Sequence, residues 1–138
     1  MALIFDTGPL FALLDRNDNE HEACRHLLDE FAEELIIPAP VLVEVDYLCA
    51  RSLPAYAFPA LLRDIEAGAF QVEDLRSEDY RRVRELCERY ADADIGFVDA
   101  AVLAVVERLR EPKLATLDRR HFNTLRPSHL DALRLLPE

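Results

Sequence analysis

Residues 2–8 have the sequence ALIFDTG, and this short stretch predicts the fold of the whole chain. Four apolar residues in a row are typical of a short strand buried on both faces, as in a parallel sheet. The run ends at Asp6, and Pro9 then favours the first turn of a helix. Open α/β sheets place their ligands at the carboxyl ends of central strands, so Asp6 is a candidate site residue. Capping of the following helix is the alternative role for this aspartate, and the stretch alone favours neither.

The rest of the chain alternates between short apolar runs and segments with helical spacing. We predict strands at 2–5, 35–37, 70–72, 114–117 and 133–136, and helices at 9–14, 20–33, 40–51, 54–67, 77–90 and 97–109. Pro59 is expected to break or kink the fourth helix. Strands that alternate with helices predict a parallel sheet covered by helices on both faces.

Length and charge restrict the class of protein. The 138 residues suffice for one domain, residues 1–138, with a net charge of −11 from 16 basic and 27 acidic residues. This balance argues against broad electrostatic binding to nucleic acid or to an anionic membrane. A nucleic-acid substrate stays open if metal ions neutralise an acidic pocket. Three cysteines without ligand spacing and the lack of an apolar run of about 18 residues predict a cytoplasmic protein without a membrane segment.

Four acidic residues are expected at one edge of this sheet. Asp6 and Asp118 end the first and fourth predicted strands, and Glu44 lies near the start of the helix that follows the second strand. Asp99 lies in the first turn of the most apolar helix, where the helix N-terminus favours a carboxylate. Glu44 stands among valines and a leucine, where an unpaired charge is costly. Each acid also has an ordinary structural alternative, as a cap, a turn residue or the partner of a buried arginine.

Close carboxylates indicate a particular chemistry. Four of them cannot stay ionised together without cations, and hard oxygen ligands select Mg²⁺ or Mn²⁺. One or two such ions can polarise a phosphodiester and activate a water molecule for attack. The four acids together therefore predict metal-assisted phosphodiester hydrolysis.

Four segments resemble a known family. They are LIFDTGPL (residues 3–10), VEV (43–45), GFVDA (96–100) and ATLDRRHF (115–122), and in this order they resemble the PIN-domain nucleases, more narrowly the VapC-type toxins of bacterial toxin–antitoxin pairs. The last segment is the most specific, and the resemblance covers nearly the whole chain. It implies a three-layer α/β/α sandwich with a small, mainly parallel sheet of four to five strands. It also implies a Mg²⁺- or Mn²⁺-dependent endoribonuclease that forms a homodimer and is inhibited by a cognate, VapB-like antitoxin.

The resemblance also implies roles for single residues. The catalytic acids and metal ligands of the family fall on Asp6, Glu44, Asp99 and Asp118. Its hydroxyl residue beside the first acid falls on Thr7, and Thr116 matches a small polar residue that supports the site. Asp94 lies near Asp99 and is expected to cap its helix or to contact an outer-shell water. Asp46 lies on a different helix face from Glu44 and is expected outside the site.

The basic residues after Asp118 have two interpretations. Arg119, Arg120 and His121 can contact substrate phosphates, or they can belong to a solvated turn with surface charges. We keep both interpretations open.

Other classes of protein fit the chain less well. The triplet Asp6-Thr7-Gly8 also occurs in aspartic proteases, but these need paired motifs in an all-β fold. Haloacid-dehalogenase-like phosphatases need a second Asp two residues later, and receiver domains need a lysine after a late strand. Two alternatives remain: a non-catalytic binding module whose acids dock a basic partner, and a PIN nuclease outside a toxin–antitoxin pair. Metal-dependent cleavage of RNA distinguishes the nuclease from the binding module.

Overall fold

The computed structural model contains one continuous sheet of five parallel strands. Its strands are β1 (Ala2–Ile4), β2 (Glu34–Pro38), β3 (Gln71–Glu73), β4 (Lys113–Ala115) and β5 (Arg134–Leu136). Parallel ladders join β1 to β2, β2 to β3 and β4 to β5. A parallel bridge between Phe5 and Ala115 connects the two groups, and the N–H of Asp6 donates to the Ala115 carbonyl at 2.9 Å. The strand order is therefore β3-β2-β1-β4-β5, which confirms the predicted parallel sheet and puts β1 at its centre.

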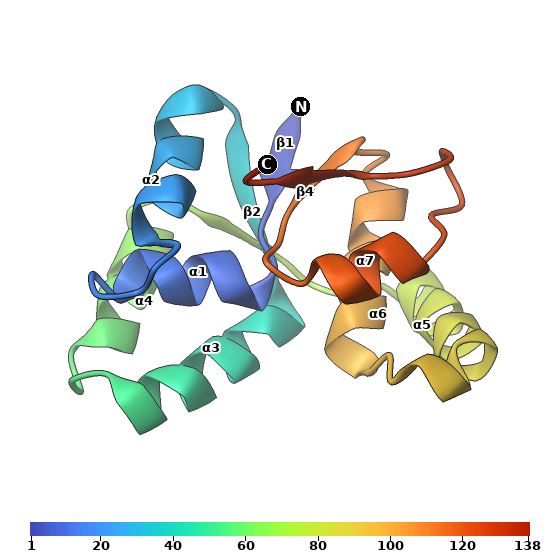
Figure 1. Cartoon of the computed structure of the whole chain (residues 1–138), viewed down its shortest axis with the longest axis horizontal. Coiled ribbons are helices and arrows are strands. Elements are labelled where there is room, and N and C mark those ends of the chain that lie inside the picture. Colours follow the sequence, from blue (N-terminus) through green and yellow to red (C-terminus); the bar gives the residue numbers. More distant parts are fainter.

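Helices cover both faces of the sheet. They are α1 (Thr7–Leu14), α2 (His21–Glu30), α3 (Ala39–Ser52), α4 (Ala57–Glu66), α5 (Ser77–Arg89), α6 (Phe97–Arg108) and α7 (Arg119–Thr124), with a short 3-10 helix at Ala91–Ala93. Figure 1 shows α1 to α4 to the left of the strands and α5 to α7 to the right. This is the predicted three-layer α/β/α arrangement. None of the helices combines the length and apolarity that a membrane crossing requires.

Two local predictions are wrong. The fourth helix starts at Ala57 rather than at 54, so Pro59 lies in its first turn. A proline there interrupts no helical hydrogen bond, because the first amides of a helix have no partner within it, and α4 therefore continues past Pro59 to Glu66. The segment after Asp118 is the helix α7 and not a turn.

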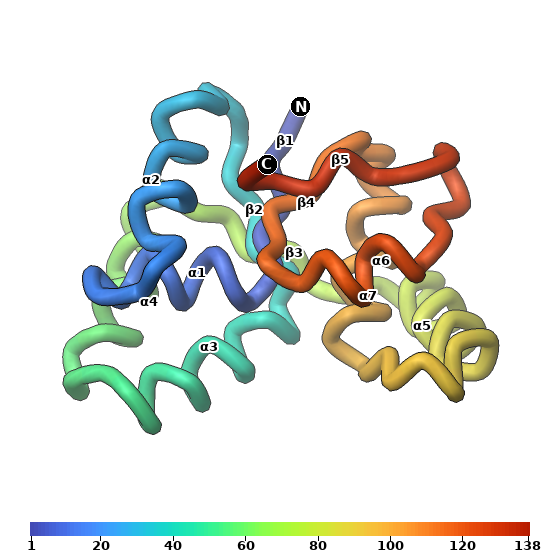
Figure 2. Tube along the Cα trace, viewed as in Figure 1, coloured from blue at the N-terminus to red at the C-terminus, as the bar shows by residue number.

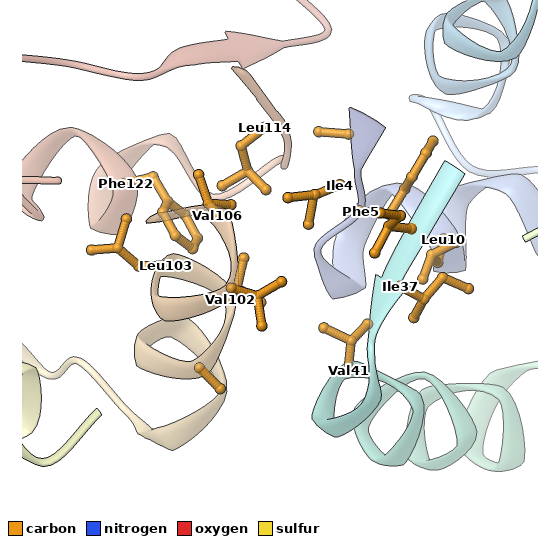
Figure 3. Close-up of a cluster of buried hydrophobic side chains, with 14 of the residues drawn as sticks. Ile4, Phe5, Leu10, Ile37, Val41, Val102, Leu103, Val106, Leu114 and Phe122 are labelled. Carbon is orange, nitrogen blue, oxygen red and sulfur yellow. The ribbon is translucent and has the colours of Figure 1, made fainter. Parts of the chain in front are cut away.

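The core lies between the central strands and the two helical layers (Figure 3). Ile4 and Phe5 are fully buried, and the Phe5 ring packs edge-on against Phe70 with the centroids 5.6 Å apart. Helix α6 is buried from Ala100 to Glu107, which explains its long apolar run. Burial of β1 on both faces fixes the position of the residue that follows it, Asp6.

Candidate active site

All four predicted acids meet at the carboxyl edge of the sheet. They line one cavity of about 510 Å³, whose lining residues are Asp6, Thr7, Gly8, Glu44, Asp99, Leu117, Asp118 and His121. The first and last thirds of the chain contribute to this cavity because β1 lies beside β4, as Figure 2 shows for the blue and orange segments. The strand order reverses at this pair, and such a reversal opens a crevice at the strand ends.

Asp6 is the most buried of the four acids, with 5% of its surface exposed. Its carboxylate makes no capping hydrogen bond to α1 and instead accepts one from the Thr116 hydroxyl at 2.8 Å. The pKa of Asp6 is raised to about 6, mainly because the carboxyl is buried; hydrogen bonds from the Thr7 backbone N–H and the Thr116 hydroxyl oppose the rise, and the charges of Asp99 and Glu44 add to it. The capping interpretation of Asp6 is therefore wrong.

Thr116 ties two of the acids together. Its hydroxyl donates to Asp6 Oδ2 and accepts from the backbone N–H of Asp118 at 3.0 Å. Asp118 in turn caps α7, because its Oδ1 accepts from the N–H of His121 at 3.1 Å. The capping interpretation of Asp118 is therefore correct, yet it engages only one carboxylate oxygen and leaves Oδ2 directed to the cavity.

Glu44 comes from the second turn of α3. Its Oε1 accepts a hydrogen bond from the Thr7 hydroxyl at 2.6 Å, so the first turn of α1 holds the glutamate in place. Glu44 is exposed, and its neighbour Val43 has 73% of its surface exposed. The expectation of an apolar setting around Glu44 is wrong, because the apolar residues Val41 and Val45 face the core on the other side of the helix.

Asp99 faces His121 across the cavity. The His121 Nδ1 atom lies 2.9 Å from Asp99 Oδ2 and 2.7 Å from Asp118 Oδ2. Burial raises the pKa of Asp99, and the charges of Asp118 and Glu44 add to this, whereas His121 opposes it. The sequence predicted either a substrate-phosphate contact or a place in a surface turn for His121, but not a position between two of the acids. The signal that could have found it is its spacing, three residues after an aspartate that opens a helix.

The remaining predicted residues lie outside the cavity. Asp94 is exposed in a left-handed turn with φ of 58°, and Asp46 is exposed on α3. The Arg119 guanidinium donates to the backbone carbonyls of Leu135 and Pro137, so it holds the end of the chain and does not point into the cavity. Arg120 is exposed on α7.

Gly8 allows two parts of the site to come close. A Cβ atom at this position would lie 3.2 Å from Leu117 Cβ, which is tighter than ordinary contact. The missing side chain lets the first turn of α1, with Thr7, pack against the loop that carries Asp118.

Comparison with known proteins identifies the family. The family model for the PIN domain matches residues 3–126. The chain belongs to the PIN-domain family. It is 34% identical to Ribonuclease VapC26 of Mycobacterium tuberculosis over 125 residues, which are 91% of this chain and 93% of the relative.

Two solved structures share the fold. VapC20 of M. tuberculosis, described as a sarcin-ricin loop cleaving toxin, has a TM-score of 0.75 at 21% identity and covers 81% of this chain and 86% of its own. VapBC2 of Rickettsia felis, bound to a DNA fragment from its promoter, has a TM-score of 0.71 at 16% identity over 98% of this chain and 97% of its own.

The donor set of this PIN domain fits a divalent cation. No lysine or arginine lines the cavity, so only the His121 ring faces the four acids. One ligand atom from each of Asp99, Asp118 and His121 lies within 4.8 Å of the others. Clustered carboxylates of this kind repel one another, and hard cations with oxygen ligands relieve the repulsion. Burial, together with this repulsion, raises the pKa of Asp6 and of Asp99.

Proposed function

We propose that the chain is a Mg²⁺- or Mn²⁺-dependent endoribonuclease and the toxin of a toxin–antitoxin pair. The observation that carries this proposal is the cavity in which four carboxylates meet without a lysine or arginine. The 34% identity to Ribonuclease VapC26 over nearly the whole chain supports RNA as the substrate. A site built only to stabilise the fold would balance these charges with an arginine or lysine, because a buried carboxylate such as that of Asp6 is costly without a cation.

Different hydrogen bonds position the four acids, and we assign them different roles. Asp6, Asp99 and Asp118 would hold the ion, since Thr116 positions the side chain of Asp6 and the backbone of Asp118. Glu44, held by the Thr7 hydroxyl, would ligate the ion or orient the attacking water. Thr7 and Thr116 are positioning residues. Asp94 does not line the cavity, and we propose no role for it in the site.

A bound divalent ion supplies positive charge that polarises the phosphodiester and activates water for attack. The chain itself must bring the substrate there against a net charge of −11. Arg120 is the exposed cation next to the site and would contact a substrate phosphate, whereas Arg119 is engaged by the chain end.

A homodimer is supported by an apolar patch beside the site. We define the apolar patch as Val43, Tyr47, Tyr80 and Phe97, all at least 48% exposed. Three of these residues line a pocket of about 570 Å³, which Glu44 also lines, so the patch borders the site. Exposed apolar surface of this kind marks protein contacts, and a second copy of the chain would cover it.

The antitoxin is the second proposed partner. The acidic cavity suits an arginine or lysine from an inhibitory protein, since no arginine or lysine of the chain itself lines it. The three cysteines are all free, which suits the reducing cytoplasm where such a pair would act.

Cleavage of a mixed RNA pool by tag-free protein, with Mg²⁺, Mn²⁺ or EDTA, tests the activity. We expect discrete cuts that need the metal and that disappear in Asp6→Asn and Glu44→Gln. Asp46→Asn is the matched control, because it removes an exposed acid from the same helix as Glu44 and should cut like the parent. Absence of cutting by folded, antitoxin-free protein would favour the non-catalytic binding module, and equal cutting by Asp6→Asn would refute the assigned site.

A further inference from the structure

His121 is the only residue lining the cavity whose side chain offers a nitrogen atom. Its side chain is 19% exposed, and its Nδ1 atom is buried. This nitrogen lies between two carboxylate oxygens, 2.9 Å from Asp99 Oδ2 and 2.7 Å from Asp118 Oδ2, but neither contact has the angle of a hydrogen bond. The ring therefore presents a nitrogen to the place where the free oxygens of two acids converge.

The separation of these atoms is closer to that of neighbouring ligands in an octahedral centre than in a tetrahedral one. Bonds of ~2.0–2.2 Å at right angles, as in octahedral Mg²⁺ or Mn²⁺ centres, put neighbouring ligand atoms ~2.8–3.1 Å apart, so this separation does not by itself distinguish the two ions. Tetrahedral Zn²⁺ with bonds of ~2.0–2.1 Å would put them ~3.3–3.4 Å apart. The two distances in this structure, 2.9 Å and 2.7 Å, lie at or just below the octahedral range and well below the tetrahedral one.

The chemistry of the donors narrows the ion further. Mg²⁺ takes oxygen ligands almost exclusively, whereas first-row transition ions also accept imidazole nitrogen. Mn²⁺ is the member of that series that favours carboxylates and octahedral coordination, so two carboxylates and one imidazole suit it better than Mg²⁺.

We propose that His121 ligates the metal through Nδ1, beside Asp99 and Asp118, and that this nitrogen makes the centre select Mn²⁺ over Mg²⁺. This inference rests on the proposed metal site and deepens it. The short helix α7 provides the arrangement, because Asp118 caps it through Oδ1 and thereby sets the His121 backbone, and its ring, beside Asp118 Oδ2. The other three histidines, His21, His26 and His129, lie outside the cavity.

Pulsed electron paramagnetic resonance of Mn²⁺ bound to tag-free protein at pH 8 tests the ligand directly. We expect a nitrogen modulation of the Mn²⁺ signal, and its change when the protein is labelled with ¹⁵N-histidine, which needs no mutation. His121→Gln should lose the modulation, and the control His26→Gln, which changes an exposed histidine on α2, should keep it. Bound Mn²⁺ without nitrogen modulation would overturn the proposal while leaving the metal nuclease intact.

Competition between the two ions tests the selectivity. Replacement of a metal ligand should weaken binding at least as much as loss of the groups that orient ligands, which costs ~10–100-fold. We therefore expect His121→Gln to weaken Mn²⁺ binding by about tenfold or more and to leave Mg²⁺ binding within about threefold. If His121→Gln bound Mn²⁺ and Mg²⁺ more tightly than the parent, and by the same factor, the proposal would be overturned. The ring would then be a counter-ion of the acids that competes with the metal. Failure of the parent to bind Mn²⁺ at all would overturn both this proposal and the metal-dependent function.

Discussion

The two edges of the same sheet bury charge in opposite ways. At the amino edge, the only lysine, Lys113, is 4% exposed, and its Nζ lies 2.7 Å from Glu33 Oε2 and 3.5 Å from Glu111 Oε2. Its ammonium also donates to the Ala2 carbonyl, while Glu111 Oε1 accepts from the Ala2 N–H at 2.9 Å. At the carboxyl edge, four carboxylates face a single imidazole.

The difference separates structural charge from functional charge. At the amino edge a cation and a backbone donor face the two acids, so the cluster joins β1, β4 and the segment before β2 without a ligand. At the carboxyl edge the acids keep free oxygens and a raised pKa for Asp6 and Asp99. A cluster of acids that no cation of the chain neutralises is a candidate site for a positively charged ligand.

The largest expected effect is on catalysis at the carboxyl edge. Asp99→Asn should lower the rate of RNA cleavage by ~10³-fold or more, because the charge that holds the metal is gone. Its melting temperature without metal should equal or exceed that of the parent, since one repelling charge is removed. Cleavage assays and thermal unfolding of the same preparation check this. A variant that loses both activity and stability would show that Asp99 also stabilises the fold, as the acids of the amino edge do.

The opposite result is expected at the amino edge. Lys113→Met should lower the free energy of unfolding by ~3–5 kcal/mol, because buried Glu111 and partly buried Glu33 are left without a cation. Protein that remains folded should still cut RNA, since this cluster lies at the far end of the sheet. Combining it with Glu33→Gln and Glu111→Gln should recover part of the lost stability in urea unfolding. If Lys113→Met were as stable as the parent, Lys113 would not be needed to neutralise Glu33 and Glu111.

The pH dependence of stability should come from the carboxyl edge. With the pKa of Asp6 raised from 3.8 to about 6, the folded state keeps a proton that the unfolded chain has lost between these values. A rise in pH through that window therefore favours unfolding, and stability falls by up to ~3 kcal/mol, at 1.36 kcal/mol per pKa unit. Asp6→Asn should lack this fall and be more stable than the parent above pH 6. Urea unfolding in EDTA from pH 4 to 8 measures it, and parallel profiles for the two proteins would argue against a raised pKa.

Metal should stabilise only the carboxyl edge. Mn²⁺ at 100 times its dissociation constant should add ~2.7 kcal/mol to the free energy of unfolding, because it binds the folded state alone. Asp99→Asn should lose most of this gain, and the Lys113→Met protein should keep it. Thermal unfolding with and without Mn²⁺ measures both. An equal gain in the parent and in Asp99→Asn would place the metal elsewhere.

The sequence predicts the position of the acids well, because that position follows from topology. A strand that ends in Asp6, another that ends near Asp118 and parallel pairing between them are enough to bring both carboxylates to one edge. Apolar periodicity alone places Asp99 at the start of α6 and Glu44 near the start of α3. No knowledge of side-chain directions is needed at that level.

Details that depend on side-chain direction could not be predicted in the same way. Val43 and Glu44 lie in an apolar run but on the exposed face of α3, because that helix buries only one side. Arg119 follows Asp118 in sequence, yet its guanidinium reaches back to the last strand and leaves Arg120 as the free cation. His121 joins the acids only because six residues after Asp118 form a helix, and helices that short carry little periodic signal.

The central place of β1 has a consequence for when the site comes into being. Its neighbour β4 is made more than a hundred residues later, and Thr116, which holds Asp6, is made with it. A chain still growing on the ribosome thus carries Asp6 and Glu44 without their partners, and the cavity closes only after Asp118 and His121 have emerged. A nuclease assembled in this order gains its complete set of site residues only after residues 116–121 have been made.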